Sequence, residues 1–166
     1  MRKIDEPVEA QVLTDADVGA PRAEEGAGQQ GLSADEGLPG FDPARSWYHG
    51  SQLELTTIRR GSTITQKREL ARVFSHKPPL VCVSDEGQIK HTGTLPGCLY
   101  VIAEEVGEGD VMPHPRTTMG PGDEWLTRRE LRVRLLGRTE IVEGERFTDE
   151  ELAAVQEYTV VRGTRV

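Results

Sequence analysis

The stretch GCLYVIAEEV, residues 97–106, decides the fold, because its run of large and β-branched apolar side chains favours a long β-strand. Further segments that favour strands are SWYHGS (46–51), LVCVS (80–84), EWLT (124–127) and LRVRLLGRTEIV (131–142). The turn-forming segments GST (61–63) and DEG (85–87) lie between them. The pattern predicts a domain of several short strands, the first of which ends at Gly50.

Two segments carry helical patterns. In the first, apolar residues recur at i, i+3 and i+4 between Thr65, the expected N-cap, and about His76, after which two prolines stop the helix. In the second, TDEE (148–151) is a capping box that opens a helix to about Tyr158. Residues 107–123 are rich in Gly, Pro and polar groups, so we expect a long irregular loop there. The sequence therefore predicts a compact α+β domain with two helices.

The first part of the chain differs in composition from the rest. Residues 1–45 contain ten acidic and four basic residues, a net charge of −6, and one aromatic residue, Phe41. The whole chain carries −8, which leaves −2 for residues 46–166. So little apolar area cannot offset the entropy of ordering a backbone, and we expect 1–45 to be a disordered tail with a short nascent helix over Glu9–Val18. The near-neutral domain, 46–166, lacks the charge that general nucleic-acid binding needs.

Cysteine and histidine usage argues against a disulfide framework and a metal site. Cys82 and Cys98 each lie in an apolar run, which predicts buried thiols, and His76, His91 and His114 are widely scattered. No apolar run approaches the roughly 20 residues of a membrane span, and the N-terminus has no apolar signal core. We therefore expect a soluble, cytoplasmic protein without membrane contact.

Two short segments offer candidate chemistry. YHGS (48–51) places a histidine at a strand end beside a glycine, where backbone can approach a flat ligand closely. The alternative is a plain strand edge with an exposed histidine and a turn glycine. Glu124 stands directly after the 107–123 loop, at the start of an apolar strand, where its carboxylate can face a cleft. The alternative there is a charged turn.

YHGS near the start of a small α+β domain resembles the NAD-binding opening of the His-type ADP-ribosyltransferases, in which the histidine bonds a ribose hydroxyl and the glycine backbone holds the nicotinamide amide. The order of the later segments is similar to that of the small rifamycin ADP-ribosyltransferases: GCLYVI (97–102), Glu104, Gly109-Asp110, Pro121-Gly122 and Leu131-Arg132-Val133. The resemblance covers about residues 46–142. It implies the split β-sheet of that superfamily and NAD as a substrate.

The resemblance also implies a role for each candidate residue. EWLT looks like the Glu-aliphatic-Leu stretch of toxin-type members, which makes Glu124 the expected catalytic acid, because an anion stabilises the positive charge that develops on the ribose. Asp110 competes for this role, since the rifamycin enzymes place their acid in that loop, and we favour Glu124. The expected NAD-binding residues are Tyr48, His49, Gly50, Ser51, Thr63 and Phe74, and His49 is also counted in the catalytic set. Arg59 and Arg60 form a basic corner that could serve the pyrophosphate.

The chain departs from the family pattern at two points. The middle segment has no tyrosine to stack on nicotinamide, which leaves Phe74, Tyr48 or Tyr100 for this role, or a core position for Phe74. Gly122 stands where protein-arginine modifiers have an acid or Gln, which disfavours arginine as the acceptor. We predict an NAD-dependent ADP-ribosyltransferase whose acceptor is an unknown protein, small molecule or nucleic acid. The alternatives are an inactive binding or assembly protein of this fold, with a tail that docks a partner protein, and an RNA 2'-phosphotransferase, whose Trp-Leu-Thr stretch resembles 125–127.

Overall fold

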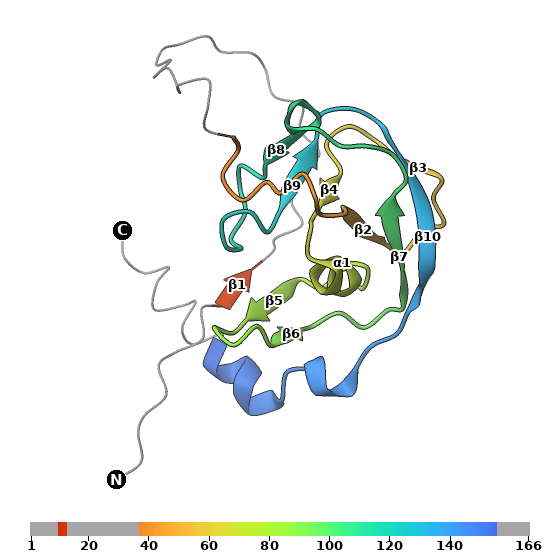
Figure 1. The fold of residues 1–166 in the computed structure, drawn as a ribbon. Coiled ribbons are helices and arrows are strands. Elements are labelled where there is room, and N and C mark those ends of the chain that lie inside the picture. The colour runs from red at the N-terminus through yellow and green to blue at the C-terminus, as the bar shows by residue number, and fades with distance from the viewer. Residues whose placement is uncertain (1–9, 13–36, 156–166) are drawn as a thin grey trace, which may run out of the picture.

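The computed structural model describes residues 10–12 and 37–155 of the 166-residue chain. These residues form an α+β domain in which curled antiparallel sheets surround a short helix, α1 (Arg68–Phe74) (Figure 1). The central sheet has the order β2 (Tyr48–Ser51), β7 (Gly97–Ile102), β10 (Leu131–Thr139) and β3 (Thr57–Ile58). A second sheet has the order β4 (Thr63–Ile64), β9 (Trp125–Thr127) and β8 (Val111–Pro113). A third has the order β1 (Ala10–Val12), β5 (Leu80–Val83) and β6 (Ile89–His91).

Shorter elements complete the described chain. Two 3-10 turns, η1 (Glu108–Asp110) and η2 (Glu143–Glu145), follow β7 and β10. A second helix occupies 149–155. The first two sheets meet where Tyr48 N donates to the Thr65 carbonyl oxygen at 2.8 Å and Thr65 N donates to that of Tyr48 at 3.0 Å. This bridge brings β2 and β4 side by side.

The core is built on an aromatic cluster. Trp47 and Trp125 are almost fully buried, and their rings meet edge to face at 5.6 Å between centroids. Phe41 packs on both of them, at 5.7 Å from Trp47 and 6.2 Å from Trp125. Large rings bury much apolar area, so this cluster stabilises the contact between the first two sheets. Phe41 belongs to the 1–45 segment, so part of that segment packs on the core.

Helix α1 packs directly against the central sheet at two glycines that face it. A Cβ at Gly50 would lie 2.0 Å from the Ala71 carbonyl oxygen, and a Cβ at Gly97 would lie 2.4 Å from the Ser75 carbonyl oxygen. The hydroxyls of Ser75, the C-cap of α1, and Thr139, the last residue of β10, form a hydrogen bond of 2.6 Å. Any larger residue at either glycine would therefore push α1 away from β2 and β7.

A buried polar cluster lies on the other side of α1, between β6 and η2. His76 and His91 are buried, and their rings stack with centroids 5.3 Å apart and planes 7° apart. His76 Nδ1 bonds the Leu95 carbonyl oxygen at 2.7 Å, and the Glu145 carboxylate, which pairs with Arg72, lies 3.7 Å from His91 Nε2. Burial, and then the nearby His76, lower the pKa of His91, and Glu145 offsets this only in part. His91 is therefore neutral at neutral pH.

The structure confirms the α+β class and the main strands. The expected runs at 46–51, 80–84, 97–106, 124–127 and 131–142 contain β2, β5, β7, β9 and β10. The capping box is confirmed too, since Thr148 N donates to Glu151 Oε2 at 2.8 Å and Glu151 N donates to Thr148 Oγ1 at 3.2 Å. The expected end of that helix at Tyr158 lies outside the described residues.

Three local predictions are wrong. Lys67, not Thr65, is the N-cap of α1, because the Thr65 backbone is engaged in the bridge to Tyr48. The 107–123 segment is not wholly irregular, because it contains η1 and β8, and β8 gains its hydrogen bonds from β9. Ala10–Val12 pair with β5 as a strand, which overturns the helix expected there. Residues 1–9 and 13–36, where most of the expected disordered tail falls, lie outside the described residues.

Candidate functional site

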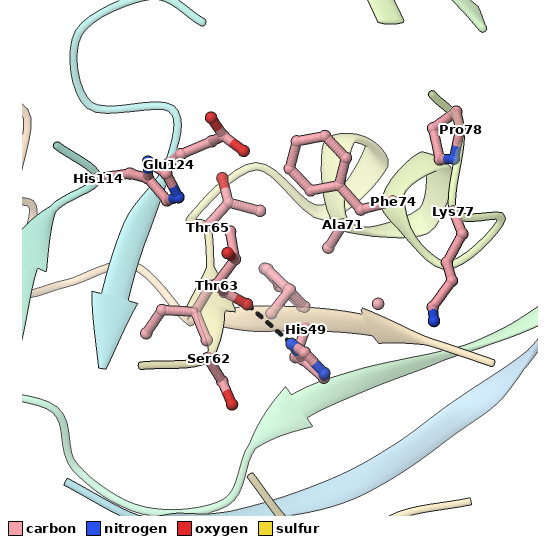
Figure 2. A pocket seen from close by; sticks show the side chains of 13 residues that line it. His49, Ser62, Thr63, Thr65, Ala71, Phe74, Lys77, Pro78, His114 and Glu124 are labelled. Atoms are coloured by element: carbon pink, nitrogen blue, oxygen red, sulfur yellow. Dashed lines mark hydrogen bonds between the residues drawn. The ribbon is translucent and has the colours of Figure 1, made fainter. Parts of the chain in front are cut away.

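One pocket gathers most of the candidate residues from distant parts of the sequence. It has a volume of about 330 Å³ and lies between β2, β4, α1 and the chain that enters β9. Such a volume is at the lower end of the range for small-molecule sites. The candidate residues that line it are Tyr48, His49, Gly50, Thr63, Phe74 and Glu124. Figure 2 shows the side chains that surround it.

His49 is held in one orientation by β4. Its Nδ1 lies 2.8 Å from the Thr63 carbonyl oxygen (Figure 2). A carbonyl oxygen can only accept, so Nδ1 carries the proton and Nε2 keeps its lone pair. Burial lowers the pKa of His49, and the bond to Thr63 offsets this only in part. At neutral pH the ring is therefore a neutral acceptor, which can bind a hydroxyl hydrogen of a ligand through Nε2.

Glu124 is fixed by the loop that precedes β9. The side chain is nearly buried, with the residue only 5% exposed, and the Thr117 hydroxyl donates to its Oε2. The Met119 N–H donates in turn to the Thr117 hydroxyl at 3.0 Å, which orients that donor. His114 N donates to the Glu124 carbonyl oxygen at 3.0 Å and continues the β8–β9 ladder by one pair. The carboxylate is therefore held in a defined position at the pocket wall.

The remaining wall of the pocket combines an apolar ring with a cation. Phe74, the last residue of α1, is half-buried, and Figure 2 shows its ring at the pocket between Glu124 and Lys77. The Lys77 side chain is exposed and makes no ion pair within 37–155. An aromatic face beside an unpaired ammonium suits a flat ligand that carries negative charge.

Two candidate residues lie outside this pocket. The Ser51 hydroxyl instead accepts a hydrogen bond from Leu53 N at 3.1 Å. Asp110 is held by Arg129, whose Nε lies 2.6 Å from Asp110 Oδ1, and this bond is the main cause that lowers the Asp110 pKa. Arg129 also binds Glu104, at 3.1 Å. Asp110 therefore belongs to a network of ion pairs that fastens η1 to the β9–β10 turn.

The structure gives Gly50 a packing role that the sequence did not indicate. Its missing side chain makes room for α1, because helix backbone occupies the space that a Cβ would need. Gly50 backbone still lines the pocket. A larger residue there would disturb the helix before it blocked any ligand.

Sequence reasoning missed several residues of the site. His114 and Lys77 both line the pocket, and Thr117 orients Glu124. His114 lies near Glu124 because of the β8–β9 register. The Gly- and Pro-rich composition of 107–123 predicts an irregular loop, so the sequence gives no sign of this strand pair. No local signal marks Thr117 as a partner of Glu124, because this contact forms across a loop.

Other kinds of site are not found in the part of the chain that the structure describes. Within 10–12 and 37–155, no three His, Cys, Asp or Glu residues gather in a way that could hold a metal ion. Among the same residues, no helix has the length and apolar character needed to cross a membrane. Cys82 and Cys98 are both buried, as predicted, and neither forms a disulfide. Comparison of the chain with protein-family models, with curated proteins and with solved structures finds no match.

Proposed function

We propose that this protein is an NAD-dependent ADP-ribosyltransferase that cleaves the nicotinamide–ribose bond and transfers ADP-ribose to an acceptor. The observation that carries the proposal is that His49 and Glu124, 75 positions apart in the sequence, line the same pocket in fixed orientations. His49 offers a neutral acceptor nitrogen, and Glu124 offers a carboxylate. These are the two groups that the chemistry needs most.

In the reaction, the bond between the ribose carbon and the nicotinamide nitrogen breaks, and its electron pair leaves with nicotinamide. The ribose carbon becomes electron-poor, and a nearby anion lowers the energy of that state. In this proposal Glu124 supplies that anion, and its support is that the carboxylate is nearly buried and is oriented by Thr117. The acceptor atom then bonds to the ribose carbon, and its proton passes to the carboxylate or to water.

His49 and the aromatic residues have binding roles in this proposal. Nε2 of His49 accepts a hydrogen bond from a ribose hydroxyl, and the bond to Thr63 keeps the ring in the tautomer that this needs. Phe74 or Tyr48, both at the pocket, can stack on the nicotinamide ring. This arrangement replaces the tyrosine that the middle segment lacks.

Release of nicotinamide from NAD, followed by chromatography, tests the proposal. Glu124→Gln keeps the shape of the side chain and removes its charge, so we expect kcat to fall by about 100-fold while NAD binding changes little. Asp110→Asn is the matched control, because that acid is occupied by Arg129, and it should retain kcat within about twofold. If Asp110→Asn abolishes release while Glu124→Gln does not, the wrong acid has been chosen. If the wild-type protein releases no nicotinamide with water or any acceptor, the proposal fails and the binding-protein alternative takes its place.

A further inference from the structure

A second pocket lies at the end of β9 and is lined by two arginines, Arg60 and Arg128. It has a volume of about 250 Å³, and its lining residues are Arg60, Gly61, Met112, Leu126, Thr127 and Arg128. Neither arginine side chain has a carboxylate partner within 37–155, and no acidic residue lines this pocket. By contrast Arg129, the next residue, is neutralised by Asp110 and Glu104. The second pocket is therefore a place of uncompensated positive charge in a domain that is near neutral overall.

The strand register places lining residues of both pockets on one face of the sheet β4-β9-β8. Thr63 pairs with Leu126, and Leu126 pairs with Met112. Residues that pair directly across antiparallel strands project from the same face, and residues two apart on one strand do so as well. Thr63 lines the first pocket, whereas Leu126 and Met112 line the second. Glu124, two residues before Leu126, lies on this face too.

The opposite face of the same sheet is the core, which agrees with this alternation. Ile64 and Trp125, a pair one step along the ladder from Thr63 and Leu126, are 1% and 0% exposed. Thr127, the last residue of β9, lies three residues beyond Glu124, or about 10 Å along an extended strand. A ligand that reaches from the carboxylate to both arginines must extend over this distance. One sugar ring is too short for that, and a dinucleotide is long enough.

We propose that Arg60 and Arg128 form a phosphate-binding subsite for a substrate whose reacting end occupies the pocket of His49 and Glu124. The inference rests on the proposed function for the identity of that substrate. Planar guanidinium groups bind phosphate oxygens through pairs of hydrogen bonds, and the half-buried Met112 and Leu126 add apolar contacts beside the two exposed arginines. The phosphate belongs either to the pyrophosphate of NAD or to a phosphorylated acceptor.

Titration calorimetry of the full chain with inorganic pyrophosphate tests the subsite directly. We expect measurable binding to the wild-type protein, about tenfold weaker binding for Arg60→Gln and for Arg128→Gln, and a smaller loss for Arg128→Lys, which keeps the charge but not the forked geometry. Arg134→Gln is the matched control, and it should bind as the wild type does. Arg134 is an exposed arginine on β10 that has no ion pair within the described residues and lines neither pocket. Absence of binding to the wild type, or equal losses in all three glutamine variants, overturns the subsite.

The KM for NAD in the nicotinamide-release assay then identifies the source of the phosphate. A KM raised about tenfold by Arg60→Gln and Arg128→Gln, with kcat unchanged, assigns the subsite to the pyrophosphate of NAD. An unchanged KM together with lost pyrophosphate binding assigns it to a phosphorylated acceptor. If pyrophosphate binding depends on the arginines but the wild type does not cleave NAD, the subsite stands and the proposed function fails. If NAD is cleaved and the arginine variants bind pyrophosphate normally, the proposed function stands and the subsite is refuted.

Discussion

Replacing Gly50 with alanine tests why a glycine stands beside His49. The new Cβ would lie 2.0 Å from the Ala71 carbonyl oxygen and 2.5 Å from Ser75 N, and such atoms essentially never approach within 3.0 Å. Both are backbone atoms of α1 and its C-cap, so no side-chain rotation can relieve the overlap. The helix must therefore move away from β2 by about 1 Å.

The energetic cost follows from the packing that this movement disrupts. Extra methyl groups forced into a well-packed interior cost about 1–3 kcal/mol, and a clash with rigid backbone belongs at the upper limit. We therefore expect Gly50→Ala to lower the free energy of unfolding by about 3 kcal/mol, a large part of the 5–15 kcal/mol that holds an ordinary domain together. Gly137→Ala is the matched control, because a Cβ at this strand glycine would have no heavy atom within 4 Å. It should be neutral or stabilise the fold by up to about 1 kcal/mol.

Urea unfolding followed by tryptophan fluorescence measures both variants, because Trp47 and Trp125 are buried in the native core. The midpoint for Gly50→Ala should fall well below that of the wild type, with an unchanged slope, while that of Gly137→Ala should not fall. Equal midpoints for the two variants would refute the packing argument. A Gly50→Ala protein of wild-type stability that no longer binds NAD would show that the glycine serves the ligand instead.

Three further outcomes are expected. Thr117→Val removes the donor that orients Glu124, and kcat for nicotinamide release should fall by about tenfold. The melting temperature should fall slightly, because the Met119 N–H loses its acceptor. An unchanged kcat would mean that Thr117 does not position the acid. Folding lowers the pKa of His91, so the unfolded chain binds the proton at a higher pH than the folded protein does. The contribution of His91 to the free energy of unfolding should therefore be fully present above pH 6.5. It should decrease as the pH falls through 6.5 toward the lower pKa of the folded protein. His91→Asn should reduce this slope, measured as melting temperature from pH 7.5 to 5.5, and an equally steep slope would assign the effect to other groups. Thr148→Ala removes the hydroxyl of the capping box and should lower the stability of the helix over 149–155 by about 1 kcal/mol. Amide hydrogen exchange at Glu151 should then be faster than in the wild type. Unchanged protection at Glu151 would contradict the cap.

The sequence by itself determined the elements that short-range chemistry dictates. The β-rich runs at 80–84 and 97–106 and the capping box at Thr148 depend on side chains within a few residues of each other, so local patterns identify them. The sequence also singled out His49 and Glu124 as residues of interest, from a histidine beside a glycine and an acid at a strand start. It could not establish that they share a pocket, because that depends on how β2, β4 and β9 meet.

Only the tertiary structure decided the surroundings of the candidate groups. In the sequence Asp110 and Glu124 are both simply carboxylates. In the structure Arg129, 19 positions from Asp110, binds Asp110 and makes it part of an ion-pair network. The tautomer of His49 depends on the Thr63 carbonyl, and the need for Gly50 depends on the approach of α1. These features arise from contacts between segments that are far apart in the sequence, and no local pattern predicts such contacts. Such contacts form only when burial of the core brings the segments together, so the physical reason for each lies in the packing rather than in the local pattern.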